Sequence, residues 1–374
     1  MLCPWLTAEP GFKVQLHRMA LACRTLTAYP RNTVIFVMVF LNKLFSCSIA
    51  ALLLIGATLQ AAEIELPEPA PIPEGLQTIE FFSPAVGRTM KFDIVLPRDY
   101  DASSKRYPVL YLLHGYMQNY TVWGRNLGAA FYARNVQDLI LVLPDGGNSW
   151  FVNYARSDDG QLNNWEDHII QDLIPYVDSN FRSEARREGR AIAGLSMGGF
   201  GAFALGLRHP HLFASIGSTS GALAFARTNA AGLAAGIPVS QGNAPRSAED
   251  QARFEEVDSF IADVIDIPGF STQEERTPAG ARFETAAQAE AYDPFEIIYN
   301  VPKSQLPHIY IDAGTEDSLI AVARELAQLL MVNNVPFDYM QSRGSHNSEY
   351  WRRSIGHMLN IQYEVMQRAL GNRP

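Results

Sequence analysis

A serine flanked by glycines at positions 194–198 (Gly-Leu-Ser-Met-Gly) is the feature that most constrains how this 374-residue chain can fold. The residues before it are apolar, as in a buried strand, and those after it are small, as in a helix packed closely on a sheet. At a tight strand-to-helix turn, glycines two positions either side of the serine remove side chains that would collide with neighbouring backbone. The pattern therefore predicts a nucleophile elbow, with Ser196 forced outward.

A serine needs a general base to become nucleophilic, and His346 fits best among the eight histidines. It lies in the Gly-Ser-His sequence at 344–346, just after the last predicted strand, and such a loop lies at the carboxyl edge of the sheet. His168 and His357 fall within predicted helices, so we expect them to be packed or solvated. We therefore predict that His346 is the base.

The third member of such a triad is an acid, and residues 312–319 (Asp-Ala-Gly-Thr-Glu-Asp-Ser-Leu) offer three candidates. Asp312 falls within a predicted strand, where we expect a buried structural partner. Asp317 falls at the end of the loop, and we predict that it is the acid; a helix N-cap is the alternative role. The chain order Ser196, Asp317, His346 is that of α/β-hydrolases.

The negative charge that develops on the substrate oxygen needs two hydrogen-bond donors. One is the amide of Met197, at the N-terminus of the helix that follows the elbow. The sequence Leu-His-Gly-Tyr at 113–116 follows the strand expected beside that of Ser196, so we predict the amide of Tyr116 as the second donor. We expect His114 to have a supporting role.

Short apolar runs recur along the chain and alternate with helical patterns in its later part. The helical patterns fall at 166–181 and 320–331. Alternation of this kind predicts an α/β fold with a doubly wound, mostly parallel sheet and helices on both faces. The candidate strands are residues 78–82, 92–96, 109–113, 139–143, 191–193, 213–216, 308–311 and 337–340.

Residues 222–300 break this alternation, because the segment is long, rich in alanine and without a clear strand. Within it, Ser247 is expected to cap an amphipathic helix that ends before Pro268. We interpret the segment as an insertion over the active site. A simple crossover between two strands, with no part in substrate binding, is the alternative.

The N-terminal residues 1–62 have the pattern of an extension followed by a signal peptide. From Met38, a short basic region ending at Lys43 precedes an apolar stretch, and Ala61-Ala62 offers small residues for cleavage. Met38 is then the predicted true start, and the protein is expected to be secreted or periplasmic. An uncleaved membrane anchor is the alternative, since a spanning helix needs about 20 apolar residues. Residues 63–75 read as a Pro-rich leader into a catalytic domain at 76–370.

Composition limits the partners of the mature chain. All three cysteines precede residue 62, which excludes disulfides and thiolate metal sites after cleavage. Residues 1–62 hold five basic and one acidic residue, so the remainder carries 25 basic and 38 acidic residues, a formal charge of −13. Nucleic acid and anionic membranes are therefore not expected as partners, and stable membrane insertion is not expected after cleavage. We expect neither a metal nor a cofactor.

Five segments together resemble the putative esterase family, which is similar to esterase D. The family includes feruloyl and acetyl-xylan esterases of carbohydrate esterase family 1, formylglutathione hydrolases, enterochelin esterases and the mycolyltransferases of the antigen 85 group. The resemblance extends over about 76–370. The matching segments are residues 112–116, 144–146, 194–199, 314–319 and 344–346.

The resemblance implies the α/β-hydrolase fold, the triad and oxyanion donors named above, and candidate substrate-binding roles for His114, Trp123 and Trp165. It implies a serine esterase, and among its members the plant-polymer esterases fit the predicted export best. The expected substrate is then a small-molecule or polysaccharide ester with short or aromatic acyl groups such as acetyl or feruloyl. An antigen 85-type acyltransferase and an enterochelin-type esterase are the alternatives. Formylglutathione hydrolases are the cytosolic branch, which a signal peptide disfavours.

Two other classes of protein are alternatives to a serine esterase. Residues 199–204 match the Gly-x-Gly-x-x-Ala dinucleotide fingerprint, but no acid occurs between Gly201 and Glu249 to bind a ribose. A non-catalytic binding protein on the same fold is the other alternative, because fold does not fix function. The complete Ser-Asp-His set favours the enzyme.

Overall fold

The computed structural model describes residues 72–135, 138–158, 160–236 and 277–372, and all of them belong to the unit Pro69–Pro374. The predicted signal peptide, most of the leader and the helix expected from Ser247 lie outside these residues. In the described ranges, no helix combines the length and the apolar character that crossing a membrane requires.

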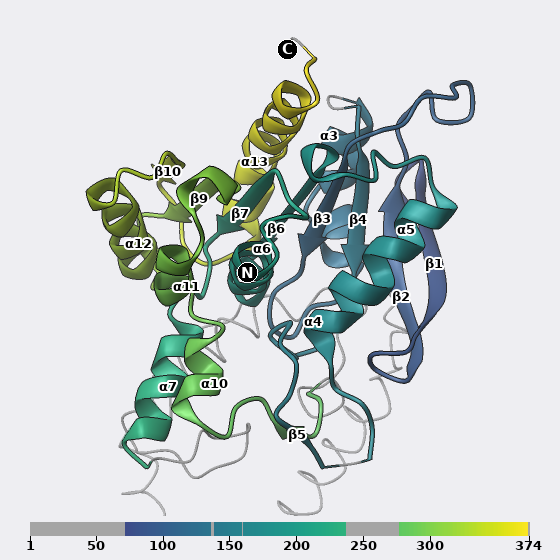
Figure 1. Cartoon of the computed structure of the whole chain (residues 1–374). Helices are drawn as coiled ribbons and strands as arrows, with labels where there is room; N and C mark the ends of the chain where they lie inside the picture. The colour runs from purple at the N-terminus through teal and green to yellow at the C-terminus, as the bar shows by residue number, and fades with distance from the viewer. Residues whose placement is uncertain (1–71, 136–137, 159, 237–276, 373–374) are drawn as a thin grey trace, which may run out of the picture. The chain divides into compact units, whose positions relative to one another are not determined.

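An eight-stranded sheet forms the centre of the described part of the chain, in the order β1-β2-β4-β3-β6-β7-β9-β10. β1 pairs with β2 and β2 with β4 in antiparallel fashion, and all later pairs are parallel (Figure 1). The strands are β1 (Leu76–Ser83), β2 (Arg88–Val95), β3 (Val109–Leu113), β4 (Ile140–Pro144), β6 (Arg190–Leu195), β7 (Ser215–Thr219), β9 (His308–Gly314) and β10 (Asp338–Ser342).

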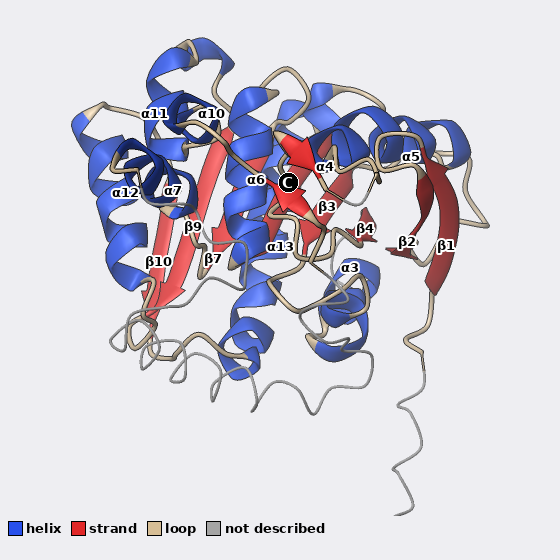
Figure 2. Ribbon diagram, turned by 90° about the horizontal axis from the view of Figure 1, so that it is seen from below, coloured by secondary structure: helices blue, strands red, loops and turns tan. Residues whose placement is uncertain are grey.

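Helices cover both faces of this sheet. Figure 2 shows α3 (Ala129–Asn135) and α13 (Ser348–Ala369) on one side, and α5 (Ile174–Asn180) and α6 (Met197–Arg208) on the other. The helix α12 (Ile320–Val332) packs on the α6 side. The doubly wound, mostly parallel α/β architecture is thus confirmed.

The side chains of β3 show why a strand at the centre of this sheet is apolar throughout. Val109, Tyr111 and Leu113 belong to the core cluster under α5, α6 and α12, whereas Leu110 and Leu112 belong to the cluster under α3 and α13. Successive side chains of a strand point to opposite faces, so a strand covered on both faces must be apolar at every position. All five residues are at most 1% exposed.

The predicted helix at 166–181 is one helical stretch in three parts. It comprises α4 (Trp165–Asp167), a π-helical turn (His168–Leu173) and α5. A second π-helical turn lies at Val122–Asn126, and short 3₁₀ turns lie at Arg187–Gly189 and Lys303–Gln305.

The described ends of segment 222–300 contain helices that the sequence analysis did not place. They are α7 (Phe225–Ala234), α10 (Ala286–Glu290) and α11 (Pro294–Asn300). A two-residue strand, β8 (Gly280–Ala281), also lies here and pairs with β5 (Arg156–Ser157). The segment thereby contacts the loop that follows β4.

Candidate active site

Ser196 lies at the turn between β6 and α6, with φ 51° and ψ −117°. A left-handed φ is rare for a residue with a side chain and persists only where the surroundings impose it. Here the Ser196 amide donates to the Thr219 carbonyl, and the Ser196 carbonyl accepts from the amides of Phe200 and Ala222. These bonds hold the serine at the carboxyl end of the sheet.

Gly194 and Gly198 allow the elbow to close. A Cβ on Gly194 would lie 2.4 Å from the Gly198 backbone, and a Cβ on Gly198 would lie 2.4 Å from the Leu113 carbonyl oxygen. Real Cβ atoms do not approach backbone so closely, so any other residue would force the turn open. The short distance from Gly198 to the Leu113 carbonyl also shows that the elbow lies directly against the segment that leads to Tyr116.

His346 and Asp317 lie beside Ser196, on the loops after β10 and β9. His346 Nε2 is 3.0 Å from Ser196 Oγ, and His346 Nδ1 is 3.0 Å from Asp317 Oδ2. Backbone hydrogen bonds from Thr315 to Ser342 and from Glu316 to Gly344 join the two loops. The structure therefore brings together the three residues that the sequence analysis selected.

Asp317 fixes the tautomer of His346. Burial alone would raise the pKa of the Asp317 carboxyl, but the hydrogen bond and charge of His346 outweigh burial and lower this pKa below its usual range. The carboxylate is then ionised near neutral pH and can only accept. His346 Nδ1 must carry the proton, which in the neutral ring leaves Nε2 as an acceptor for the serine hydroxyl.

Asp312 has the structural position expected for it. It is fully buried in β9 and accepts hydrogen bonds from the hydroxyls of Thr219, Tyr310 and Tyr350. Burial raises its pKa to about 6 in spite of these donors. Since Tyr350 is in the first turn of α13, Asp312 ties the strand to the helix that follows His346.

Three other histidines make their contacts with residues other than Ser196. His168 is buried, with Nδ1 2.9 Å from Ser83 Oγ. His308 Nδ1 is 2.9 Å from Ser215 Oγ at the start of β9. His209 Nε2 is 2.6 Å from Glu166.

The two predicted oxyanion donors lie on neighbouring backbone segments. Tyr116 is in the loop after β3, Met197 is the first residue of α6, and Leu113 pairs with Gly194 in the sheet. A Cβ on Gly115 would lie 2.5 Å from the Leu195 side chain, so the loop passes directly over the elbow. The role of the two amides as donors stays a prediction.

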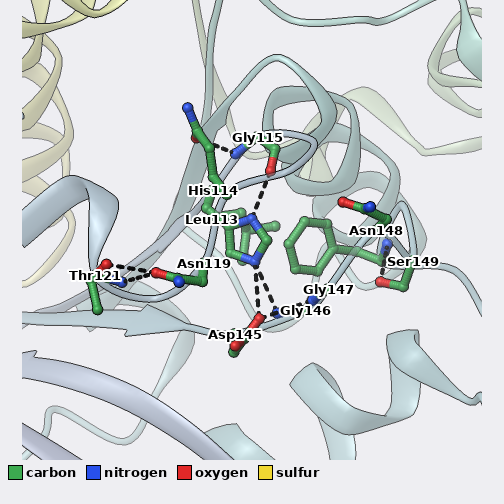
Figure 3. Close-up of polar contacts among 12 residues, drawn as sticks. Leu113, His114, Gly115, Asn119, Thr121, Asp145, Gly146, Gly147, Asn148 and Ser149 are labelled. Atoms are coloured by element: carbon green, nitrogen blue, oxygen red, sulfur yellow. Dashed lines mark hydrogen bonds and ion pairs between the residues drawn. The ribbon is translucent and has the colours of Figure 1, made fainter. Parts of the chain in front are cut away.

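His114 holds the loop that carries Tyr116. Figure 3 shows its ring between the Gly115 carbonyl, 2.8 Å from Nδ1, and the Gly146 amide, which donates to Nε2 over 3.0 Å. With Nε2 accepting, the neutral ring donates from Nδ1, so its 3.5 Å approach to Asp145 is not an ion pair in that state. Because the Gly115 carbonyl and the Tyr116 N–H share one rigid peptide group, His114 helps to direct that N–H.

His114, Trp123 and Trp165 are buried, and the substrate-binding roles that the resemblance implied for them stay predictions. His114 is 1% exposed, Trp123 is 1% exposed and Trp165 is 3% exposed. The Trp123 indole donates to the Leu113 carbonyl over 2.9 Å, and the Arg88 guanidinium covers the Trp165 ring. The contacts that the structure shows for all three are with other residues of the chain.

An aromatic cluster beside the elbow was not found by sequence reasoning. The Trp150 ring stacks on the Phe225 ring, with centroids 3.5 Å apart, and lies 6.2 Å from the Tyr116 ring. Phe200, in the first turn of α6, meets both Trp150 and Phe225 edge to face. Trp150 has φ 63°, and this strained conformation, which aims the ring, leaves no mark in the local sequence.

In the part of the chain that the structure describes, no group of three or more His, Cys, Asp or Glu side chains is arranged to hold a metal ion.

Residues 83–360 match the family described as "Putative esterase". Among curated proteins, the chain is 29% identical over 282 residues to Esterase Rv1288 of Mycobacterium tuberculosis, a match that covers 71% of this chain. The same match covers 54% of that protein, so the chain spans about half its length. An acetyl esterase of Caldicellulosiruptor saccharolyticus is 26% identical over 299 residues, which cover 78% of this chain and 98% of the acetyl esterase.

Among solved structures, a ferulic acid esterase matches with a TM-score of 0.56 at 20% identity, over 78% of this chain and 98% of the other. At this identity the likeness bears on fold alone. It agrees with the strand order and with the predicted α/β-hydrolase fold.

Proposed function

This chain belongs to the putative esterase family, and we propose that it is a carboxylic ester hydrolase with Ser196 as nucleophile, His346 as base and Asp317 as acid. The observation that carries the proposal is the pair of 3.0 Å contacts that His346 makes, from Nε2 to Ser196 Oγ and from Nδ1 to Asp317. An acyl-enzyme mechanism needs this relay, because an ordinary serine hydroxyl is a weak nucleophile.

In the proposed first half-reaction, Ser196 Oγ bonds to the ester carbonyl carbon while its proton passes to His346 Nε2. The amides of Tyr116 and Met197 donate to the oxygen that becomes negative. His346 then gives its proton to the alkoxy oxygen as the carbon–oxygen bond breaks, which releases the alcohol and leaves an acyl-serine. Asp317 stabilises the transient imidazolium.

In the second half-reaction, water attacks the acyl-serine and gives its proton to His346, which returns it to Ser196 Oγ. The carboxylic acid leaves and the enzyme is restored. In each half-reaction His346 first accepts a proton and then gives it up, so no further acid or base is required.

We propose short or aromatic acyl groups as substrates, from esters of small molecules or polysaccharides. The cluster of Tyr116, Trp150 and Phe225 beside the elbow supports this choice, because aromatic rings favour flat apolar groups. The names of two similar proteins, an acetyl esterase and a ferulic acid esterase, point the same way. We also propose that the protein is exported, on the strength of the apolar stretch after Met38.

A fluorophosphonate tests the proposed nucleophile, because it forms a stable adduct only with an activated serine. We expect labelling at Ser196, found by mass spectrometry of the digested protein, together with hydrolysis of p-nitrophenyl acetate. Ser196→Ala should lose both labelling and at least about three powers of ten in rate. Hydrolysis by Ser196→Ala at the rate of the wild type would exclude the mechanism.

A further inference from the structure

The amides on both sides of Tyr116 are held by buried side chains. The Gly115 N–H donates to Gln118 Oε1 over 2.8 Å, and the Met117 N–H donates to Asn148 Oδ1 over 2.8 Å. These two bonds fix the peptide groups on either side of the one that carries the Tyr116 N–H, and Met117 has a left-handed φ of 64°. The direction of the Tyr116 N–H therefore depends on partners that hold this turn in place.

Asn148 is the partner that comes from outside the turn. It lies in the loop after β4, on the same loop as Gly146 and Ser149 (Figure 3), and its side chain is fully buried. Its Nδ2 donates to Thr277 Oγ1 over 3.1 Å, and its backbone carbonyl accepts from the Arg282 guanidinium over 3.1 Å. One carboxamide thus joins the Tyr116 turn to the end of segment 222–300.

The two ends of the carboxamide have different tasks. Oδ1 is the acceptor that the Met117 amide needs, and Nδ2 is a donor that a carboxylate or an aliphatic side chain lacks. Because Thr277 accepts from Nδ2, it sets the rotation of the carboxamide that turns Oδ1 toward Met117. Thr277 therefore supports the same turn through Asn148.

We infer that Asn148 is a positioning residue, which holds the Tyr116 amide in line with the oxyanion and which Thr277 orients in turn. The inference rests on the proposed function, because only a reacting ester gives that amide its task. Donors of this kind act only when they are aligned with the oxyanion before the reaction, and a misplacement of about 1 Å costs about a hundredfold in rate.

Asn148→Leu tests the inference, since leucine has nearly the same size but cannot accept from Met117. We expect kcat for p-nitrophenyl acetate to fall about tenfold to a hundredfold, with KM changed much less. Affinity for an aryl trifluoromethyl ketone, whose adduct with serine carries an oxyanion, should fall by a similar factor.

Asn153→Leu is the matched control. Asn153 Oδ1 also accepts from backbone amides, those of Glu166 and Asp167, but it does so at the start of α4. Its loss should lower thermal stability and leave kcat and ketone affinity near those of the wild type. A purely structural role for Asn148 would give the same pattern in Asn148→Leu and would overturn the inference.

Thr277→Val removes the Thr277 hydroxyl alone and covers the case in which Asn148→Leu does not fold. We expect a loss of ketone affinity of about twofold to fivefold. The loss should be smaller than in Asn148→Leu, because Asn148 Oδ1 can still accept from Met117 but the carboxamide has lost the partner that orients it. Hydrogen–deuterium exchange of peptides covering 113–119 should be faster in both variants, and this readout needs no activity. If exchange of these peptides is unchanged in both variants, the inference is refuted even if the protein is an esterase. If exchange is faster but the wild type does not hydrolyse esters, only the proposed function is refuted.

Discussion

Ser196 adopts a backbone conformation that suits glycine better than serine, with φ 51° and ψ −117°. Holding a residue with a Cβ in such a region costs about 1–3 kcal/mol, which the bonds to Thr219, Phe200 and Ala222 must offset. The same conformation aims Oγ at His346. Activity and stability therefore make opposite demands on this residue.

Ser196→Gly and Ser196→Ala should both be inactive but should differ in stability. Glycine relieves the backbone strain, which stabilises the folded chain by about 1–3 kcal/mol. Its greater conformational freedom in the unfolded chain lowers the free energy of unfolding by about 0.5–1 kcal/mol. We expect Ser196→Gly to be more stable than Ser196→Ala by about 1 kcal/mol in urea unfolding. Equal stabilities, or a more stable alanine variant, would show that the elbow is not strained.

The residues that the sequence could place at the site are those whose position follows from the ends of strands. Ser196, Asp317 and His346 each follow a strand of the parallel sheet, and such ends meet at one edge. Asn148 and Trp150 could not be found in this way. Their side chains are aimed by left-handed backbone at Gly147 and Trp150, which depends on tertiary contacts and not on local pattern.

At the scale of elements, all eight strands of the main sheet were predicted, although some of their ends differ by up to four residues. The central strands β3, β4, β6 and β7 are buried at every position and so read as short apolar runs. The helices α7, α10 and α11 were missed because they are short and their apolar faces are incomplete. The pairing of β5 with β8 involves only two residues on each strand, too few to leave a periodic pattern.

Glu166 joins three elements of the fold through a buried cluster. Glu166 lies at the start of α4, and its carboxylate accepts from Arg208 Nε, at the end of α6, over 2.9 Å. It also accepts from the hydroxyl of Tyr292, which precedes α11, and it lies 2.6 Å from His209 Nε2. Burial alone would raise the pKa of Glu166, but the hydrogen bonds from His209 and Arg208 outweigh it and lower the pKa to about 2.

The cluster predicts a pH dependence of stability. Because the pKa of Glu166 is lower in the folded chain than its ordinary value of 4.5, its contribution is fully present above about pH 4.5 and is lost as pH falls toward 2. Glu166→Gln should lower the free energy of unfolding at pH 7 by about 3 kcal/mol and remove this part of the acid dependence.

Urea unfolding from pH 7 to pH 3 measures the effect, and Glu80→Gln is the control. Glu80 pairs with Lys91 at the surface, with its side chain 60% exposed, and such pairs contribute little. The control should unfold like the wild type throughout. If Glu166→Gln and the wild type lose stability in parallel on acidification, the low pKa of Glu166 has been misassigned.

At the scale of the whole molecule, the proposed export predicts a shortened chain. The order of basic, apolar and small residues from Met38 to Ala62 is that of a signal peptide, so exported protein should begin at Ala62 or Glu63. N-terminal sequencing of exported material decides this. A chain that begins at Met38 or earlier in the membrane fraction would support an anchor, and a full-length cytoplasmic chain would contradict both.

The acyl acceptor is also a property of the whole molecule, because an acyl-serine can pass its acyl group either to water or to an alcohol. Which of them reacts depends on access to the acyl-enzyme, not on the triad. An acyltransferase for long lipids needs a long apolar channel, whereas the described ends of segment 222–300 place Phe225 and Thr277 against the loop after β4. We therefore expect water to be the acceptor.

A panel of p-nitrophenyl esters of rising chain length, with methyl ferulate and acetylated xylan, tests this expectation when each ester is run with and without a sugar acceptor. Short and aromatic acyl groups should be released as free acid, and the sugar should not change the rate. Long acyl chains should react slowly, because we expect the stacked Trp150 and Phe225 rings to limit the room for an acyl chain on Ser196. Phe225→Ala should then accept longer chains while its rate with the acetyl ester stays within about threefold of the wild type. Negligible hydrolysis together with ready transfer of long chains to the sugar would instead identify an acyltransferase, since the acyl-enzyme would form but exclude water.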